Sequence, residues 1–231
     1  MTGAPPAPPA ALAVFGAGLP TVTAYVDLLA TVGVERGLIG PREAPRLWER
    51  HLLNCAGLTT LLPSGATVID LGSGAGLPGL VLAACRPDLH LVLVEPLLRR
   101  ASFLIEAVSL LGLGSVEVRR DRAEDLRSAG LAADAVVARA VAPLERLAGW
   151  ALPLLRPGGN LLALKGERAQ EELAEARPAL ARLGSADARL VEVGDPNLET
   201  WSRVLVVTRA ASPEPGPVTA TRSRQRARAR R

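Results

Sequence analysis

Short apolar runs alternate with longer helical patterns through the middle of the chain. The spacing of apolar positions predicts five consecutive strands, at residues 67–71, 91–95, 116–119, 135–138 and 160–164. It also predicts helices, at residues 77–85, 97–111, 143–155 and 168–182. Near-continuous apolar strands that alternate with helices are typical of a parallel, doubly wound α/β sheet. We therefore expect an open, mostly parallel sheet with helices on both faces.

The pattern changes on either side of this alternation. Two longer strand patterns, 186–193 and 203–208, follow each other with no helix between them, which predicts an antiparallel hairpin at one edge of the sheet. Apolar positions with helical spacing at 19–38 and 41–61 predict N-terminal helices ahead of the first strand. We expect one domain over residues 19–209, with N-terminal helices at 19–62 and a Rossmann-like core at 63–209.

The two ends of the chain have compositions that favour loose structure. Residues 1–18 are rich in Ala, Pro and Gly, and we expect them to be flexible. We expect residues 210–231 to form a disordered tail, because they contain three prolines and then six arginines within the last ten positions. Without those six arginines the formal charge of +4 becomes −2, so the basic charge belongs to the tail. Such a tail gains affinity for phosphate-rich polymers by releasing counterions, although a solvated tail without a partner is the alternative.

Composition favours a globular protein of the cytoplasm. Hydrophobic residues make up 48% of the chain and charged residues 22%. We find no apolar run near the ~18–20 residues that a membrane span needs, and the proline-rich start lacks the basic region of a secretory signal. Cys55 and Cys85 lie in apolar helical segments without metal-ligand spacing. We expect them to be reduced core residues rather than a catalytic thiol, and we expect neither a metal nor a membrane partner.

The first strand leads into a glycine-rich loop whose register indicates the cofactor. Asp70, Gly72, Gly74 and Gly76 form the pattern D-x-G-x-G-x-G. A dinucleotide fingerprint counted from the first glycine requires glycine where Leu77 stands. A carboxylate at the end of the strand disfavours a pyrophosphate but suits the sulfonium and ammonium groups of S-adenosylmethionine. Glycines without Cβ atoms let such a ligand approach the backbone closely.

Residues after the next two strands complete the predicted cofactor site. Glu95 ends the second strand, where a carboxylate can accept both hydroxyls of a ribose. Ala123 and Glu124 follow the third strand, where the acid can bind an adenine amino group and the alanine leaves room for the ring. The alternative for Glu124 is an acid favoured by a helix start.

Cations, not a nucleophile, follow the later strands. Neither a Pro-Cys pair nor an Asn/Asp-Pro-Pro-Tyr/Phe motif follows the fourth strand, which argues against methylation of cytosine C5 or of an exocyclic amine. Arg139 and Lys165 end the fourth and fifth strands instead. We expect them to position the substrate by a phosphate or a base edge, with Arg50 and His51 on the same rim. A purely structural role is the alternative for His51.

Four segments together resemble the glucose-inhibited division protein B family, also called ribosomal RNA small-subunit methyltransferase G. They are R-H-L-L-N at 50–54, D-L-G-S-G-A-G-L-P-G at 70–79, V-A-R-A at 137–140 and A-L-K-G at 163–166. The resemblance covers about residues 19–209. It implies a Rossmann-like S-adenosylmethionine-dependent methyltransferase that acts on N7 of a guanine in the decoding-region loop of 16S small-subunit rRNA. By position, it implies cofactor contacts at Gly72, Leu77, Ala123, Glu124 and Arg139.

The predicted chemistry explains why the sequence offers no acid–base pair. Guanine N7 carries a free lone pair at neutral pH, so its methylation needs alignment and no general base. We expect a monomer that binds 16S rRNA or the small ribosomal subunit. The alternatives are a methyltransferase for another RNA base or a small molecule, and a cofactor-bound RNA chaperone. A dehydrogenase is disfavoured by the glycine register.

Overall fold

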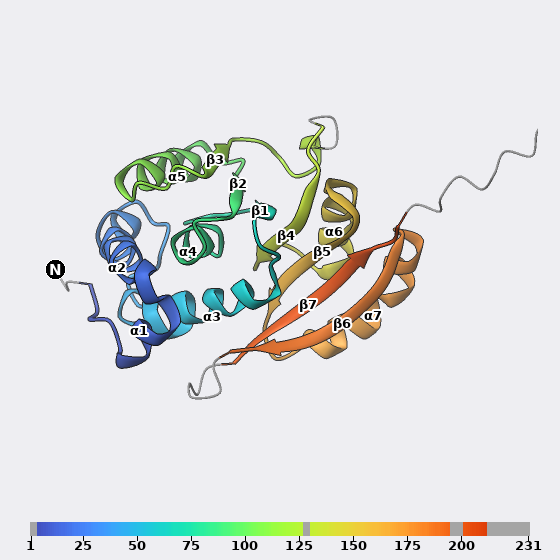
Figure 1. Ribbon diagram of the computed structural model, residues 1–231, viewed down its shortest axis with the longest axis horizontal. Helices are drawn as coiled ribbons and strands as arrows, with labels where there is room; N and C mark the ends of the chain where they lie inside the picture. The colour runs from blue at the N-terminus through green and yellow to red at the C-terminus, as the bar shows by residue number, and fades with distance from the viewer. Residues whose placement is uncertain (1–3, 127–129, 195–200, 212–231) are drawn as a thin grey trace, which may run out of the picture.

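The computed structural model describes residues 4–126, 130–194 and 201–211, which are built around a seven-stranded sheet (Figure 1). The strand order is β3-β2-β1-β4-β5-β7-β6. The strands are β1 (Thr67–Leu71), β2 (His90–Val94), β3 (Val116–Arg119), β4 (Ala133–Arg139), β5 (Leu155–Lys165), β6 (Ser185–Val193) and β7 (Ser202–Arg209). Strands β1 to β5 are parallel, and β7 runs antiparallel to both β5 and β6. The predicted fold class, with its C-terminal antiparallel hairpin, is confirmed.

Helices cover both faces of the sheet. Successive residues of a strand point to opposite faces, so Val68 packs in one core cluster and Ile69 in the other. The first cluster joins the sheet to α4 (Gly79–Cys85), α5 (Leu98–Leu110) and the N-terminal helices. The second joins it to α6 (Leu144–Ala151) and α7 (Ala169–Arg182), which lie across the sheet from α4 in Figure 1. The parallel strands therefore share one carboxyl edge between two helical layers.

Part of the segment expected to be flexible is helical. Residues 9–18 form α1 (Pro9–Phe15) and a 3₁₀ turn (Gly16–Gly18), and Ala11 and Phe15 are buried in the core. Proline is compatible with this helix because Pro9 stands in its first turn, where its missing N–H has no intrahelical partner to lose. A Cβ atom on Gly18 would lie 2.3 Å from the carbonyl oxygen of Ala84, so this turn packs directly on the end of α4.

The other N-terminal helices are more broken than the sequence pattern predicts. Helix α2 (Leu19–Leu28) continues into a π-helical turn at Leu29–Gly33. In place of one helix at 41–61, a chain of short segments follows: Ala44–Arg46 (3₁₀), Leu47–Leu52 (π), α3 (Leu53–Ala56) and Gly57–Leu61 (3₁₀). Likewise, the helix expected at 143–155 ends as a 3₁₀ turn at Leu152–Leu154, after which β5 begins. Helical periodicity alone does not reveal these changes of winding.

Within the described residues, one helical stretch is long and apolar enough to cross a membrane. It is Pro9–Gly33, with a mean hydropathy of 1.5 over its most apolar window, so the expectation of no such stretch is wrong by length and composition. The stretch is interrupted by the turn at Gly16–Gly18. Val22, Tyr25, Val26 and Leu29 are buried in the core cluster that contains α4. One face of this stretch thus packs inside the protein, whereas Leu12 on α1 is exposed.

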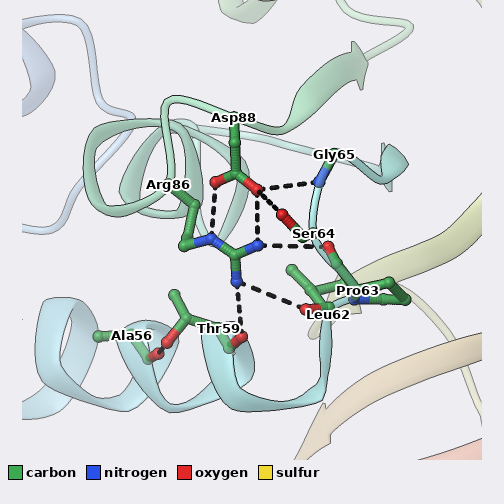
Figure 2. Close-up of polar contacts among 8 residues, drawn as sticks. All are labelled: Ala56, Thr59, Leu62, Pro63, Ser64, Gly65, Arg86 and Asp88. Atoms are coloured by element: carbon green, nitrogen blue, oxygen red, sulfur yellow. Dashed lines mark hydrogen bonds and ion pairs between the residues drawn. The ribbon is translucent and has the colours of Figure 1, made fainter.

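Arg86 ties the end of α4 to the segment that leads into β1 (Figure 2). Its guanidinium donates to both carboxylate oxygens of Asp88, each at 2.7 Å. It also donates to the carbonyl oxygens of Thr59, Leu62 and Pro63 at 3.2–3.4 Å. These carbonyls lie at the end of the last helical turn before β1, where backbone acceptors lack the full set of helical partners. The network fixes where the chain enters the first strand and hence where β1 ends.

Candidate active site

A first cavity of about 640 Å³ lies at the carboxyl ends of β1, β2, β3 and β4. Four of the predicted cofactor residues line it: Gly72, Glu95, Ala123 and Glu124. Its charged lining combines four acids with three arginines, namely Glu95, Asp121, Glu124, Asp125, Arg100, Arg120 and Arg122. In open α/β sheets, ligands bind at this edge, where the direction of strand order reverses. Here the order reverses between β1 and β4.

Glu95 links the glycine loop to the start of α5. Its side chain is 2% exposed, and its two oxygens accept hydrogen bonds from the backbone N–H groups of Gly74 (3.0 Å) and Leu97 (2.9 Å). The guanidinium of Arg100 lies 3.8 Å away. Backbone donors therefore hold the carboxylate in place at the wall of the first cavity. Each carboxylate oxygen keeps a further lone pair for a ligand hydroxyl.

The glycines of the loop are required by packing as well as by backbone conformation. Gly72 has φ +70°, and a Cβ atom there would lie 2.9 Å from the side chain of Val141. Gly76 has φ +101°, and its Cβ would lie 2.4 Å from Leu80 and 2.8 Å from the Tyr25 hydroxyl. That hydroxyl donates to the carbonyl oxygen of Ala75 at 2.6 Å. Gly76 thus makes room for protein atoms, whereas the sequence predicted that its missing Cβ leaves room for a ligand.

Asp70 and Leu77 do not line the first cavity, and neither do Gly74 and Gly76. Asp70 is fully buried, and its Oδ2 accepts a hydrogen bond from the N–H of Gly79 at 2.9 Å. Its Oδ1 has no partner in the described part of the chain. Burial raises the pKa of this carboxyl to about 7, although the Gly79 hydrogen bond acts in the opposite direction. The carboxylate lies beneath the loop, where it accepts from a buried N–H at the start of α4 that has no partner within the helix.

A second cavity of about 560 Å³ lies at the ends of β4 and β5. Three of the residues predicted to position the substrate line it: Arg50, Arg139 and Lys165. The rest of its lining is Asn54, Ala140, Leu164, Gly166, Glu167, Trp201, Ser202 and Arg203. Four cations and one acid give this cavity a positive charge. Arg139, predicted for both cofactor and substrate, lines only this cavity.

Arg139 is held by α3 and by the π-helical segment that precedes it. It donates to the sulfur of Cys55 at 3.5 Å and to the carbonyl oxygen of Arg50 at 3.5 Å, and it contacts Nδ1 of His51. Nε2 of His51 lies 3.1 Å from a carboxylate oxygen of Glu43. Burial, together with the charge of Arg139, lowers the pKa of His51, so its neutral ring accepts from Arg139 and donates to Glu43. His51 therefore lies behind Arg139, outside the cavity lining.

The buried thiol of Cys55 and the ammonium of Lys165 have clear structural partners. Burial raises the pKa of Cys55 to about 11, which keeps the thiol protonated and matches the expected reduced core cysteine. Lys165 donates to Glu172 on α7 at 2.7 Å and to the carbonyl oxygen of Ala142 at 3.0 Å. The ammonium is thereby fixed at the rim and its charge is partly balanced.

Ala140 lines both cavities and joins them. Its φ of +54° is the only positive value at a non-glycine residue in the described ranges. Left-handed backbone at alanine is costly, and such strain is concentrated at functional sites. It turns the chain sharply after Arg139, so that Arg139 lines one cavity and Val141 the other. Sequence reasoning identified the Arg-Ala pair but gave Ala140 no role.

Further lining residues were missed from the sequence. In the first cavity these include Trp150 of α6 and Arg100 of α5. In the second they include Trp201 and Arg203 at the start of β7. The antiparallel register, which pairs Lys165 with Arg203, brings the start of β7 to the carboxyl end of β5. The strand patterns predicted the hairpin but carried no signal for this register.

The sheet order, with cavities at the carboxyl ends of its parallel strands, defines a Rossmann-like fold. The S-adenosylmethionine-dependent O-methyltransferase of Thermotoga maritima has a similar fold, with a TM-score of 0.55 and 16% identity over 82% of this chain and 72% of that chain. The TYW2 protein of M. jannaschii, solved in complex with AdoMet, has a TM-score of 0.52 and 17% identity over 67% of this chain and 73% of that chain.

Sequence comparison then identifies the family. Residues 18–200 match the family described as rRNA small subunit methyltransferase G. The ribosomal RNA small subunit methyltransferase G of Thermobifida fusca is 59% identical over 207 residues, which are 90% of this chain and 87% of that protein. The protein of the same name from Streptomyces avermitilis is 54% identical over 209 residues, 90% and 88% of the two chains. This chain belongs to the rRNA small subunit methyltransferase G family, and it is an rRNA methyltransferase.

Proposed function

We propose that the protein transfers a methyl group from S-adenosylmethionine to N7 of a guanine in the decoding-region loop of 16S small-subunit rRNA. The observation that carries this proposal is the pair of cavities that meet at Ala140. Glu95, a carboxylate placed to accept ribose hydroxyls, lines one cavity, and four cations and one acid line the other. The methyl donor and the polyanionic acceptor would therefore each have a cavity of suitable chemistry, and the two cavities meet at Ala140.

The first cavity suits the donor. Glu95 would accept the ribose hydroxyls, Ala123 and Glu124 would hold the adenine, and the backbone at Gly72 would face the amino-acid part. Asp70 would act from beneath the loop, where its Oδ1 has no partner among the described residues. A cationic ligand nearby would stabilise the charged form of this carboxyl. Gly74, Gly76 and Leu77 would shape the loop that carries these contacts.

The chemistry requires alignment and no proton transfer. Bound S-adenosylmethionine supplies a methyl group on a positively charged sulfur. The guanine N7 lone pair forms the new carbon–nitrogen bond while the carbon–sulfur bond breaks and its electron pair returns to sulfur. Arg50, Arg139 and Lys165 would hold the phosphates or the base edge, and His51 would fix the guanidinium of Arg139. Holding the reactants in place can provide most of the acceleration.

The partner is 16S rRNA, free or within the small ribosomal subunit, and the enzyme acts as a monomer in the cytoplasm. Transfer of labelled methyl groups tests the substrate class. The protein, labelled S-adenosylmethionine and small subunits from a strain lacking the enzyme should yield labelled rRNA, whereas subunits from the parent strain should not. Labelled small molecules, or no label in the rRNA of either kind of subunit, would contradict the proposal and favour another acceptor.

A further inference from the structure

Trp201 is a large aromatic side chain left in contact with solvent at the substrate cavity. It is 52% exposed and directly precedes β7. Among the exposed large hydrophobic side chains of the described residues it is the only aromatic one, and the others are leucines and one isoleucine. Folding gains little from a tryptophan in this position, since about half of its surface stays in water. Its location in a cavity wall indicates a contact with a ligand.

The cations around Trp201 have defined positions. Arg203 lies two residues further along, pairs in register with Lys165 across the sheet, and forms an ion pair with Glu192 at 3.2 Å. Lys165 is held by Glu172 and Ala142. The side chain of Arg203 keeps 41% of its surface exposed. One wall of the second cavity thus combines an exposed aromatic ring with two cations.

This combination suits a nucleotide in a single strand. Unpaired bases stack on aromatic side chains, while cations bind the neighbouring phosphates. An acidic peptide would use the cations but would gain little from the ring. Asn54 adds an amide to the same cavity, and amides bind base edges.

We propose that Trp201 stacks on a nucleobase of the RNA strand that enters the second cavity, with Lys165 and Arg203 on the adjacent phosphate. This inference rests on the proposed function, because it takes the occupant of the cavity to be the RNA substrate. The stacked base is the methylated guanine or one of its two neighbours, since Trp201 and Ala140 line the same cavity. A base that becomes cationic on methylation would also be favoured by the face of the indole ring.

A double-mutant cycle, in which the protein and the RNA are changed separately and together, tests the stacking. The probe is a labelled stem-loop RNA with the sequence around the methylated guanine, plus three versions that lack the base at the guanine or at either neighbour. Affinities are measured by fluorescence anisotropy. Trp201→Ala should weaken binding of the intact RNA by roughly 5- to 150-fold, the range of one base stack, while Trp201→Phe should stay within about fivefold of the wild type. On one of the base-deficient RNAs, the difference between Trp201→Ala and the wild type should disappear.

The matched control is Leu110→Ala, which removes an exposed apolar side chain of α5 that lines neither cavity. It should bind all four RNAs like the wild type, and thermal unfolding should show that every variant is folded. Equal loss for Trp201→Ala on all four RNAs, or no loss at all, would overturn the stacking. If the wild type methylates guanine N7 but no coupling is found, only this inference fails. Coupling without methylation at N7 would instead refute the proposed reaction and leave the stacking intact.

Discussion

Arg139 connects the second cavity to the N-terminal segment through several contacts. Its guanidinium reaches the thiol of Cys55, the backbone of Arg50 and the ring of His51. The planar, forked guanidinium can make these contacts simultaneously, whereas a lysine ammonium has one point charge and a different reach. This network therefore fixes the position of the positive charge of Arg139.

Arg139→Lys should consequently lose most methyl transfer although it keeps the charge. We expect the rate to fall by roughly 100-fold, which is the order expected when a positioning group is displaced by about 1 Å. The measurement is methyl transfer to small subunits under single-turnover conditions. Arg168→Ala, which removes an exposed arginine of the segment before α7, should keep the wild-type rate. A wild-type rate for Arg139→Lys would show that the charge alone suffices.

Asp70 gives the protein a stability that depends on pH. Its pKa is about 7 in the folded protein, against roughly 3.9 in an unfolded chain. The folded state therefore binds the proton more tightly, so the stability that protonation provides is present below about pH 4 and is lost as the pH rises to 7. Asp70→Asn is neutral throughout and avoids this loss. We expect its advantage to grow between pH 5 and pH 8 and to reach at most about 4 kcal/mol.

Urea unfolding of the cofactor-free protein at both pH values measures this effect. Asn also keeps an acceptor for the Gly79 N–H. Alanine would leave that group unpaired, which would lower the stability for a second reason. The control is Asp187→Asn, which changes an exposed acid of β6 and should follow the wild-type pH dependence. Parallel pH profiles for Asp70→Asn and the wild type would contradict the assignment.

At the scale of elements, the glycine loop is held by α2, a helix outside the alternating strands and helices of the Rossmann-like core. The hydroxyl of Tyr25 on α2 donates to the carbonyl oxygen of Ala75 and would lie only 2.8 Å from a Cβ atom on Gly76. The N-terminal segments thus shape the glycine loop and also contribute Arg50 to the lining of the second cavity.

Tyr25→Phe should loosen the loop while it leaves the ring packed. It removes one buried hydrogen bond and leaves the Ala75 carbonyl without a partner, which costs about 1–3 kcal/mol of stability. We expect S-adenosylmethionine to bind several-fold more weakly by calorimetry, whereas Thr31→Val, an exposed change on the neighbouring turn, should have little effect. Unchanged cofactor affinity in a destabilised Tyr25→Phe protein would restrict Tyr25 to a structural role.

Elements were predictable from the sequence where local pattern and packing agree. The strands at 67–71 and 116–119 match β1 and β3, because β1 is a mostly apolar buried run and β3 alternates valine with charged residues at the sheet edge. Helix α1 was not predictable from composition, since its Ala- and Pro-rich sequence packs through tertiary contacts such as Phe15 against Trp48. The changes of winding before α3 have the same origin, because they bring His51 to Arg139, which is distant in the sequence.

The site is organised, at the scale of the whole molecule, by the reversal of strand order between β1 and β4. Sequence reasoning could place Glu95, Arg139 and Lys165 at one edge, because parallel strands end on the same side. It could not divide them between two cavities, since that division depends on the backbone turn at Ala140. Nor could it find Trp201, whose place depends on the register of an antiparallel strand. The arginine-rich tail lies outside the described residues, and its affinity for RNA stays a prediction.

Chemical mapping of the modified nucleotide tests the central claim most directly. Borohydride reduction followed by aniline cleaves RNA at 7-methylguanosine, so strand breaks report both the base and the atom that is methylated. Small-subunit rRNA treated with the protein and S-adenosylmethionine should show one new break, at a guanine of the decoding-region loop, and omission of S-adenosylmethionine should abolish it. Methyl incorporation without such a break, or a break at a guanine elsewhere, would contradict the account.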